Sequence, residues 1–509
     1  MSEARGTKPA WVPGNAGQLA FWLGAYLLLH LAIRLIFSGT LQLDDAEQVV
    51  LGQELSLGYD LPQPPLYTWV YWGLSRVFGP GLVTLTGMKY ALIAGMFLVL
   101  WRVARRLFQE TAWRIAAVLA FLLLPVFAWQ MHVGFTHTVL MMLACAMTFH
   151  ALLRLMDKVP ARPMDHAWLA VAVAVGLMSK YGYHIYLGLL LAAAFSLPEW
   201  RRALRRRGPL LALALAVLAA LPYHLWLWEH REWVAQSVAH KFAGTHRLDL
   251  GVAGRLRPVL ATLEYMLPLL LVLAWLAPRA FLPMRPMAQA SAPERLLARF
   301  HAILLVVAVA ALAAVDLHYV KARWMTPMLF LLPLWLLLRA RRLAPQGAAR
   351  ILRAAVVLSA VVLLARAADF AFGARLGSDG RVHWPVTAAL RALPPACLRA
   401  DAVVVPGNFL AAHVVEARSS SAVPRPVYSQ SLRPVRPPAR LPASLAVVWD
   451  DEIPVDVVWN YMEHGLGVPP GAYARGETLS AEAHNGKVRY AVHCMILTRR
   501  SEYIGRGAQ

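Results

Sequence analysis

The stretch GQLAFWLGAYLLLHLAIRLIFS, residues 17–38, is the first of a series of apolar segments and decides the class of this protein. A helix needs about 20 predominantly apolar residues to cross a lipid bilayer. The polar sequence MSEARGTKPAWVPGN precedes the stretch, which has no small-residue cleavage site and is longer than the core of a signal peptide. We therefore predict a retained membrane anchor.

The composition of the whole chain agrees with a membrane protein. Of its 509 residues, 59% are hydrophobic and 15% are charged, and the mean hydropathy is +0.51. Soluble domains carry about 25% charged residues and disordered chains have low hydrophobicity, so both classes are excluded. The 50 Lys and Arg residues exceed the 28 Asp and Glu residues. In so apolar a chain this surplus is typical of cytoplasmic loops, and we expect no nucleic-acid partner.

Further apolar segments follow the first one. The longer ones lie at 82–101, 112–131, 134–153, 209–228, 258–278, 301–317 and 354–372, and three shorter ones at 166–179, 183–198 and 324–338. Arginine clusters such as RRALRRR at 201–207 recur in every second loop. Because short loops rich in Lys and Arg stay in the cytoplasm, we predict eleven spans, with residues 1–16 inside and the C-terminus outside. The same rule favours a hairpin at 166–198, which keeps the 201–207 cluster inside.

The composition changes after residue 372. Short β-rich runs at 401–406, 445–450 and 490–497 alternate with helical or Pro-rich stretches, which predicts a small α/β domain at 373–509, outside the membrane. Cys397 and Cys494 both fall in this domain. They can pair in an oxidising compartment, but two cysteines alone leave the question open.

The first outer loop, residues 39–81, is rich in acidic residues. It contains Asp44, Asp45 and Glu47, and has no basic residue before Arg76. Two amphipathic helices on the outer surface, with a carboxylate pair at the start of the first, can form the floor of a reaction site. Another interpretation is structural, because Asp44-x-x-Glu47 has the spacing of a capping box that stabilises a helix end. The two roles are compatible.

Lysine is rare in this chain, and three lysines lie where a cation is costly. Lys89 falls inside a predicted span, Lys180 at a tight outer turn, and Lys321 beside Arg323 in the outer stretch DLHYVKARW, which also holds His318. Charges at the membrane are functional candidates unless they reach the interface by snorkelling, which is the alternative for Lys321 and Arg323. Glu264, inside another span, is a candidate partner for one of these cations.

Other motifs point away from metal and nucleotide chemistry. The outer histidines show no HExxH or comparable spacing, and no CxxC is present, so we expect no metal site and no cofactor. GxGxxG, Walker and GxSxG motifs are also absent from the sequence. The acidic run at 449–452 follows a predicted strand and is typical of a strand-end turn.

Several of these motifs resemble those of the GT-C membrane glycosyltransferases that use polyprenyl-phosphate sugars. The resemblance covers about residues 17–372, and its branch includes bacterial lipid A aminoarabinose transferases, rhizobial galacturonic acid transferases and protein O-mannosyltransferases. The residues that carry it are Asp44-Asp45, Gln63-Pro64-Pro65-Leu66-Tyr67, Gly176-Leu177-Met178-Ser179-Lys180-Tyr181, Glu264-Tyr265-Met266-Leu267-Pro268 and Arg323-Trp324-Met325-Thr326-Pro327. The resemblance implies an all-α GT-C transmembrane catalytic domain at 17–372, with periplasmic juxtamembrane helices in the catalytic loop 39–81.

The resemblance also implies roles for these residues. Asp44 would be the catalytic base that deprotonates an acceptor hydroxyl, and Asp45 would orient Asp44 or contact the acceptor. The departing phosphate needs cations, for which we predict Lys89, Lys180, Lys321 and Arg323. The predicted substrate pocket comprises Gln63, Tyr67, His137, Tyr181, Glu264 and His318. Two departures from the family pattern matter: Gln63 replaces a basic residue, and Thr136-His137-Thr138 replaces an aspartate, which points to a different sugar.

The predicted function is therefore that of an inverting glycosyltransferase of the bacterial inner membrane. It would move a sugar from a polyprenyl-phosphate donor to a periplasmic acceptor, with lipid A or lipopolysaccharide core favoured over other envelope lipids, glycans or proteins. A transporter or lipid-linked sugar flippase is the alternative, but it predicts two similar halves, which the sequence lacks. A non-catalytic sensor on the same scaffold is a third hypothesis, and it would tolerate loss of Asp44 and Asp45.

Overall fold

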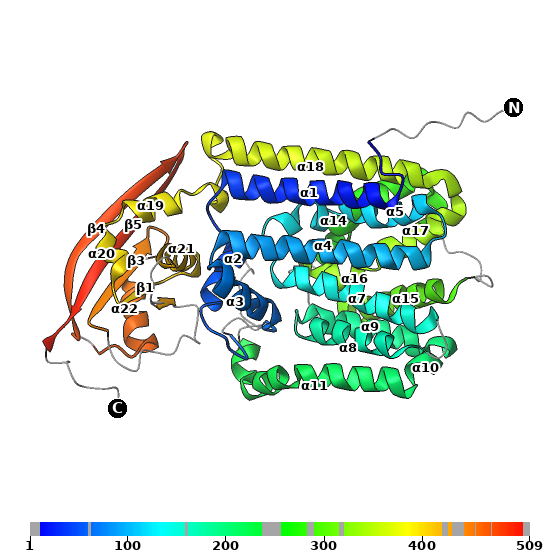
Figure 1. The fold of residues 1–509 in the computed structure, drawn as a ribbon, viewed down its shortest axis with the longest axis horizontal. Helices are drawn as coiled ribbons and strands as arrows, with labels where there is room; N and C mark the ends of the chain where they lie inside the picture. The colour runs from blue at the N-terminus through cyan, green and yellow to red at the C-terminus, as the bar shows by residue number, and fades with distance from the viewer. Residues whose placement is uncertain are drawn as a thin grey trace. The chain divides into compact units, whose positions relative to one another are not determined.

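A computed structural model gives the fold of the chain (Figure 1). It describes residues 11–59, 63–157, 161–236, 256–281, 290–314, 320–419, 426–429, 442–453, 455–469 and 471–501. The predicted pocket residue His318 lies outside these ranges. The chain divides into two compact units, and each is described by itself: unit 1 is Met1–Leu29 with Ala91–Leu363, and unit 2 is His30–Tyr90 with Leu364–Gln509.

Unit 1 is helical in its described part. Its helices are α5 (Thr111–Leu119), α6 (Pro125–Ala128), α7 (His137–Asp157), α8 (Pro163–Leu177), α9 (Gly182–Phe195), α10 (Pro198–Leu204), α11 (Arg207–Glu229), α14 (Arg257–Leu276), α15 (Ala292–Ala314), α16 (Thr326–Leu329) and α17 (Leu332–Leu343). Short helices η1 (Ala120–Leu123), η2 (Gln130–His132), η3 (Pro278–Phe281), η4 (Ala322–Met325) and η5 (Pro345–Gly347) connect them. In this unit α8 packs against α7 and α11, and α9 packs against α15 (Figure 1).

Three long helices are divided between the residue ranges of the two units. They are α1 (Ala16–Phe37), α4 (Leu82–Leu107) and α18 (Ala348–Leu376). Together with α7, α11, α14 and α15, they make up the 7 described helices that are long and apolar enough to cross a membrane. Each predicted apolar segment contains helix in its described part, and 324–338 divides into the short helices η4, α16 and the start of α17.

Some predicted spans are short or broken. The pair Thr111–Leu123 and Pro125–His132 bends by 82° and raises the number of spans to as many as 8. The bend falls at Pro125, which lacks the N–H that a continuous helix needs. The predicted hairpin at 166–198 is present as α8 and α9, which have 15 and 14 residues. These lengths are below the roughly 20 residues of a complete span.

The acidic loop forms the two short helices that the sequence predicts, α2 (Leu43–Leu51) and α3 (Leu66–Phe78). The N-cap of α2 is Gln42, which makes no side-chain capping bond. Asp44 therefore lies inside the first helical turn, and the capping-box interpretation is wrong. A carboxylate in that turn still interacts favourably with the helix dipole.

The C-terminal part of unit 2 is a small α/β domain, as predicted. Its sheet has the order β2-β1-β3-β5-β4. The strands are β1 (Ala402–Val405), β2 (Val427–Ser429), β3 (Ser444–Asp450), β4 (Tyr473–Asn485) and β5 (Val488–Arg499), and the helices are η6 (Arg381–His383), α19 (Val386–Ala392), α20 (Pro395–Arg399), α21 (Asn408–Arg418), α22 (Val455–Asn460) and η7 (Tyr461–Gly465). β1 pairs in parallel with β2 and β3, and β5 pairs antiparallel with β3 and β4.

A disulfide joins α20 to strand β5 of this sheet. Cys397 and Cys494 are bonded, with their Cα atoms 6.2 Å apart, and Cys494 lies opposite Val448 of β3. The question that the sequence left open is therefore answered by the fold. The pairing favours an oxidising compartment for this domain, because disulfides are rare in the cytosol.

Candidate functional site

Asp45 and Lys89 form a buried ion pair in unit 2. The distance from Asp45 Oδ1 to Lys89 Nζ is 2.9 Å, and the two side chains are 2% and 4% exposed. Asp45 lies on the buried face of α2, next to Ala46 and one turn before Val49. Lys89 lies on α4. The costly cation that the sequence places inside a span therefore has a carboxylate as its partner.

Asp44 occupies a different face of the same helix. Successive residues of an α-helix point about 100° apart, so Asp44 and Asp45 cannot face the same surroundings. Asp44 is partly exposed, whereas Asp45 is buried. Of the two carboxylates, Asp44 is the one that an external molecule can reach.

Tyr67 of α3 lies in the field of both carboxylates. Its side chain is fully buried, and burial, together with the charges of Asp45 and Asp44, raises the pKa of Tyr67 well above its usual value. The phenol therefore keeps its proton and can act only as a neutral hydrogen-bonding group. The sequence predicts its aromatic ring as part of the pocket, and the structure places it near the acidic pair.

Two buried arginines in unit 2 were not singled out from the sequence. Arg34 of α1 and Arg366 of α18 are each 4% exposed. The guanidinium of Arg34 donates to the carbonyl oxygens of Ser38, at 3.0 Å, and Thr40, and it interacts electrostatically with Asp45 and Arg366. The signal was present in the sequence, because Arg34 is the only charged residue of its apolar stretch. Arg34 also interacts with Glu416, so buried basic groups and acidic groups are interspersed around Asp45.

The start of the acidic loop is held by the C-terminal domain. The hydroxyl of Ser38 donates to the Val382 carbonyl, and that of Thr40 to the Trp384 carbonyl, each at 2.6 Å. The Leu41 N–H donates to Nε2 of His413 at 3.3 Å. These bonds fix the chain immediately before α2, and hence the position of its carboxylates.

The other end of α2 and the start of α4 are held in the same way. The Gln53 amide makes two 3.1 Å bonds with strand β2, accepting from the Val427 N–H and donating to the Val427 carbonyl. The Glu416 carboxylate of α21 accepts from the Leu82 N–H at 3.2 Å. β2 is an edge strand, so the Gln53 amide also occupies backbone groups that would otherwise be unpaired at this edge.

Unit 1 contains a cavity of about 510 Å³ that unites three of the predicted residues, Lys321, Arg323 and Glu264. Its lining also includes Trp129 and Arg257. The partner of Glu264 in this cavity is Arg257, which is none of the cations predicted to pair with it, and Nη1 lies 2.7 Å from Oε1. α14 packs against η4, and this packing brings the two groups of charges together.

A second group of predicted residues in unit 1 surrounds the turn before α9. Lys180 Nζ donates to Thr138 Oγ1 at 2.7 Å, which places this lysine next to the segment that holds His137. The hydroxyl of Tyr181 is 2.5 Å from that of Tyr223. The remaining predicted residue, Gln63, lies in unit 2, half-buried, and its Oε1 has no hydrogen-bond partner among the described residues. In the described ranges no group of three or more His, Cys, Asp and Glu side chains has the geometry to hold a metal ion.

Comparisons with known proteins agree with this architecture. Residues 62–226 match the family model of dolichyl-phosphate-mannose-protein mannosyltransferases. Among curated relatives from Rhizobium johnstonii, lipopolysaccharide core galacturonosyltransferase RgtA is 25% identical over 404 residues, and RgtB is 26% identical over 409 residues. Each alignment covers 76% of this chain and 79% of the relative.

A solved structure with the same fold is that of ArnT from Cupriavidus metallidurans bound to undecaprenyl phosphate. The TM-score is 0.61 at 13% identity, with 94% of this chain and 98% of that chain covered. The apo form of the same protein gives a TM-score of 0.56. At this identity the likeness shows the fold, while the family match and the relatives show the class of enzyme. The chain is a multi-pass membrane glycosyltransferase with the GT-C fold.

Proposed function

We propose that this glycosyltransferase moves a sugar from a polyprenyl-phosphate donor to a hydroxyl group of a cell-envelope glycan, with lipopolysaccharide core as the favoured acceptor. The donor class is supported by the undecaprenyl phosphate named in the solved ArnT structure. The acceptor class is supported by the names of the two rhizobial relatives. The active site faces the periplasm of a bacterial inner membrane in this proposal, with residues 373–509 on the same side.

The observation that carries the proposal is the contrast between the two aspartates of α2. Asp45 has a fixed cationic partner, and its neighbour Asp44 is partly exposed. Asp44 removes the proton of the acceptor hydroxyl, whose oxygen attacks the anomeric carbon. The bond from that carbon to the phosphate oxygen breaks, and the polyprenyl phosphate leaves with the electron pair, so the anomeric configuration is inverted.

Buried cations of unit 2 are candidates for stabilising an anionic leaving group. Arg34 and Arg366 are buried, as is Lys89 beside Asp45, and a phosphate leaving group gains from preorganised positive charge. For Lys180, Lys321 and Arg323, contact with the donor phosphate stays a prediction. The same chemistry requires no metal, because the phosphate ester already activates the sugar.

The test is transfer of radiolabelled galacturonic acid from undecaprenyl-phosphate-galacturonic acid to purified lipopolysaccharide core. We expect Asp44→Asn to lower kcat by about 10²–10⁴-fold, the usual contribution of a general base, with donor binding retained. Glu47→Gln, one turn along α2, is the matched control and should keep its activity. Equal turnover of wild type and Asp44→Asn would refute the base role.

A further inference from the structure

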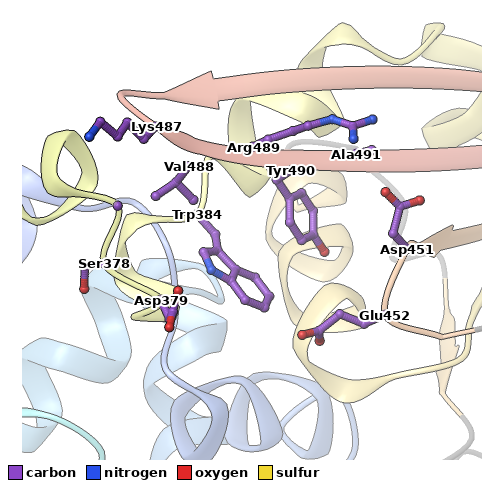
Figure 2. A pocket seen from close by; sticks show the side chains of 11 residues that line it. Ser378, Asp379, Trp384, Asp451, Glu452, Lys487, Val488, Arg489, Tyr490 and Ala491 are labelled. Carbon is purple, nitrogen blue, oxygen red and sulfur yellow. The ribbon is translucent and has the colours of Figure 1, made fainter.

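The C-terminal domain contains a polar cavity that the proposed reaction does not use. Its volume is about 340 Å³, and it is lined by the segment 377–379, Trp384, the turn at 451–452 and the start of β5 at 487–491. Figure 2 shows the rings of Trp384 and Tyr490 at its centre, with Asp379 on one side and Asp451 and Glu452 on the other. The volume falls at the lower end of the range of small-molecule sites.

The aromatic floor of this cavity is rigid. The Trp384 and Tyr490 ring centroids are 5.5 Å apart, with the planes inclined by 30°. The Tyr490 hydroxyl donates to the buried Asp450 carboxylate at 2.5 Å, and burial raises the pKa of Tyr490, so the phenol stays protonated. The guanidinium of Arg381 stacks on Trp384 at 5.2 Å from the ring centroid. Trp384, which is partly exposed, therefore presents its ring to the cavity with the buried Tyr490 ring packed beside it, next to the solvent-exposed acids.

The wall formed by the β4–β5 hairpin is also fixed. Gly486 has φ +61°, and a Cβ there would approach the Ala374 carbonyl oxygen to 2.7 Å, so only glycine fits this turn. The next residue, Lys487, donates its backbone N–H to the same carbonyl at 3.0 Å. The hairpin tip is thereby docked on the end of α18, and the Lys487 side chain is carried to the rim of the cavity.

The polar lining offers donors and acceptors together. Arg381 pairs with Glu452 at 3.3 Å, and His493 pairs with Asp451 at 2.8 Å. Among the described residues, the exposed side chains of Asp379 and Lys487 make no hydrogen bond or ion pair. Carboxylates accept hydrogen bonds and an ammonium donates them, so a hydroxyl group, which does both, is satisfied here.

The composition of the lining excludes other ligand classes. Val488 and Ala491 are its only aliphatic side chains, which is too few for a lipid tail. Arg381 neutralises Glu452, and Glu482 neutralises Arg489, which leaves Asp379 and Asp451 against Lys487 in the lining. This small excess of negative charge disfavours phosphate and uronate groups. A sugar ring combines an apolar face, which packs on aromatic rings, with hydroxyl groups around its edge. We propose that this cavity is a second saccharide-binding site, for a neutral or amino sugar.

A site of this kind would hold part of the acceptor glycan away from the place of transfer. That use rests on the proposed function, whereas saccharide binding by the cavity does not. Binding is therefore measured without a donor, so the result does not depend on whether Asp44 is the base.

The experiment uses the full chain in lipid nanodiscs, because maltoside detergents carry sugars of their own. Calorimetry and saturation-transfer NMR follow the binding of a glucosamine trisaccharide, maltotriose and trigalacturonate. We expect the first two probes to bind and trigalacturonate to bind about tenfold more weakly or not at all. Failure of both favoured probes to bind, or tightest binding of trigalacturonate, overturns the proposal.

Variants locate the binding in the cavity. Trp384→Leu removes the aromatic surface and should weaken both favoured probes about tenfold. Asp379 lies on an exposed segment, so the variant Asp379→Asn still tests the proposal if Trp384→Leu does not fold. Because Asp379→Asn removes a negative charge, it should weaken binding of the glucosamine trisaccharide more than binding of maltotriose. Asp456→Asn, an exposed acid of α22 outside the cavity, is the matched control. Wild-type affinity in a folded Asp379→Asn variant overturns the assignment.

Discussion

Asp45 and Lys89 form an ion pair between the first turn of α2 and the N-terminal part of α4, with 2.9 Å between Oδ1 and Nζ and both side chains almost inaccessible to solvent. The pair links the loop that carries the acidic residues to a long apolar helix. It also leaves the adjacent Asp44 as the more accessible carboxylate.

Breaking this pair from one side should destabilise the protein more than removing it completely. Lys89→Met leaves a buried carboxylate without its lysine, at a cost of about 3 kcal/mol. The double variant Asp45→Leu with Lys89→Met has no buried charge at either position and should recover much of that loss. Thermal unfolding of the purified variants measures both effects. A double variant that is less stable than Lys89→Met would contradict this account, and the exposed Glu482→Gln serves as a control with little change expected.

His413 should make the stability sensitive to acid. Its pKa is lowered from 6.5 to about 3 by burial and then by the charge of Arg34. The neutral ring contributes its full stability above pH 6.5, and this contribution is lost as the pH falls, because the unfolded chain takes up the proton first. From pH 7 to pH 5 the loss is about 2 kcal/mol, since one pKa unit corresponds to about 1.4 kcal/mol.

The variant His413→Gln isolates this effect, because its amide oxygen can still accept from the Leu41 N–H. We expect a smaller loss of melting temperature between pH 7 and pH 5 than in the wild type, whereas the exposed His464→Gln should behave like the wild type. Glu416 lies 3.9 Å from His413 Nδ1, and burial raises its pKa. The stability that the protonated Glu416 contributes is lost as the pH rises above 4.5, so this residue changes the stability in the opposite direction to His413. Glu416 is therefore left unchanged in both proteins that are compared. Parallel pH profiles of wild type and His413→Gln would contradict the assignment.

The two bonds between Gln53 and Val427 predict a local effect on strand β2. Gln53→Ala removes both and should cost about 1–3 kcal/mol, because each bond contributes roughly 1 kcal/mol. Hydrogen exchange followed by mass spectrometry should show faster exchange of the Val427 amide and of the end of α2. Gln346→Ala, an exposed glutamine of η5, should change neither. Unchanged exchange at residues 427–429 in Gln53→Ala would show that the contact is not formed.

The disulfide should contribute a large part of the stability of the C-terminal domain. Cys397 and Cys494 are 97 positions apart, and a disulfide that closes a loop of this length raises the free energy of unfolding by about 2–5 kcal/mol. Reduction should therefore lower the melting temperature of the wild type. The variant Cys397→Ser with Cys494→Ser should have the lower value already and not respond to reductant, whereas Cys145→Ala, which removes the free cysteine, should respond like the wild type. A reductant response that persists without Cys397 and Cys494 would exclude this origin.

Much of the architecture follows directly from the sequence. Apolar segments of sufficient length become helices because an isolated segment has no other way to satisfy its backbone in lipid. Of the eleven predicted spans, 7 described helices are long enough to cross a membrane, or up to 8 with the bent pair, and the others are shorter. The change in composition after residue 372 predicts the α/β domain, but the sequence pattern does not indicate strands β2 and β4. β2 has three residues and β4 is rich in exposed polar side chains, so neither carries a strong apolar pattern.

The sequence by itself determined that the chain is membrane-embedded, that it carries an acidic pair in one loop, and that a few cations lie where they are costly. These features depend on residue type and local spacing. Only the tertiary structure decided that Asp45 is buried against Lys89 while Asp44 is partly exposed. It also decided that Arg34 and Arg366 are buried in the same unit. The contacts that hold the acidic loop, from His413, Glu416 and Val427, likewise appear only in three dimensions. Each of these contacts joins residues far apart in the chain, and their partners are chosen by packing and charge compensation in three dimensions rather than by any local pattern.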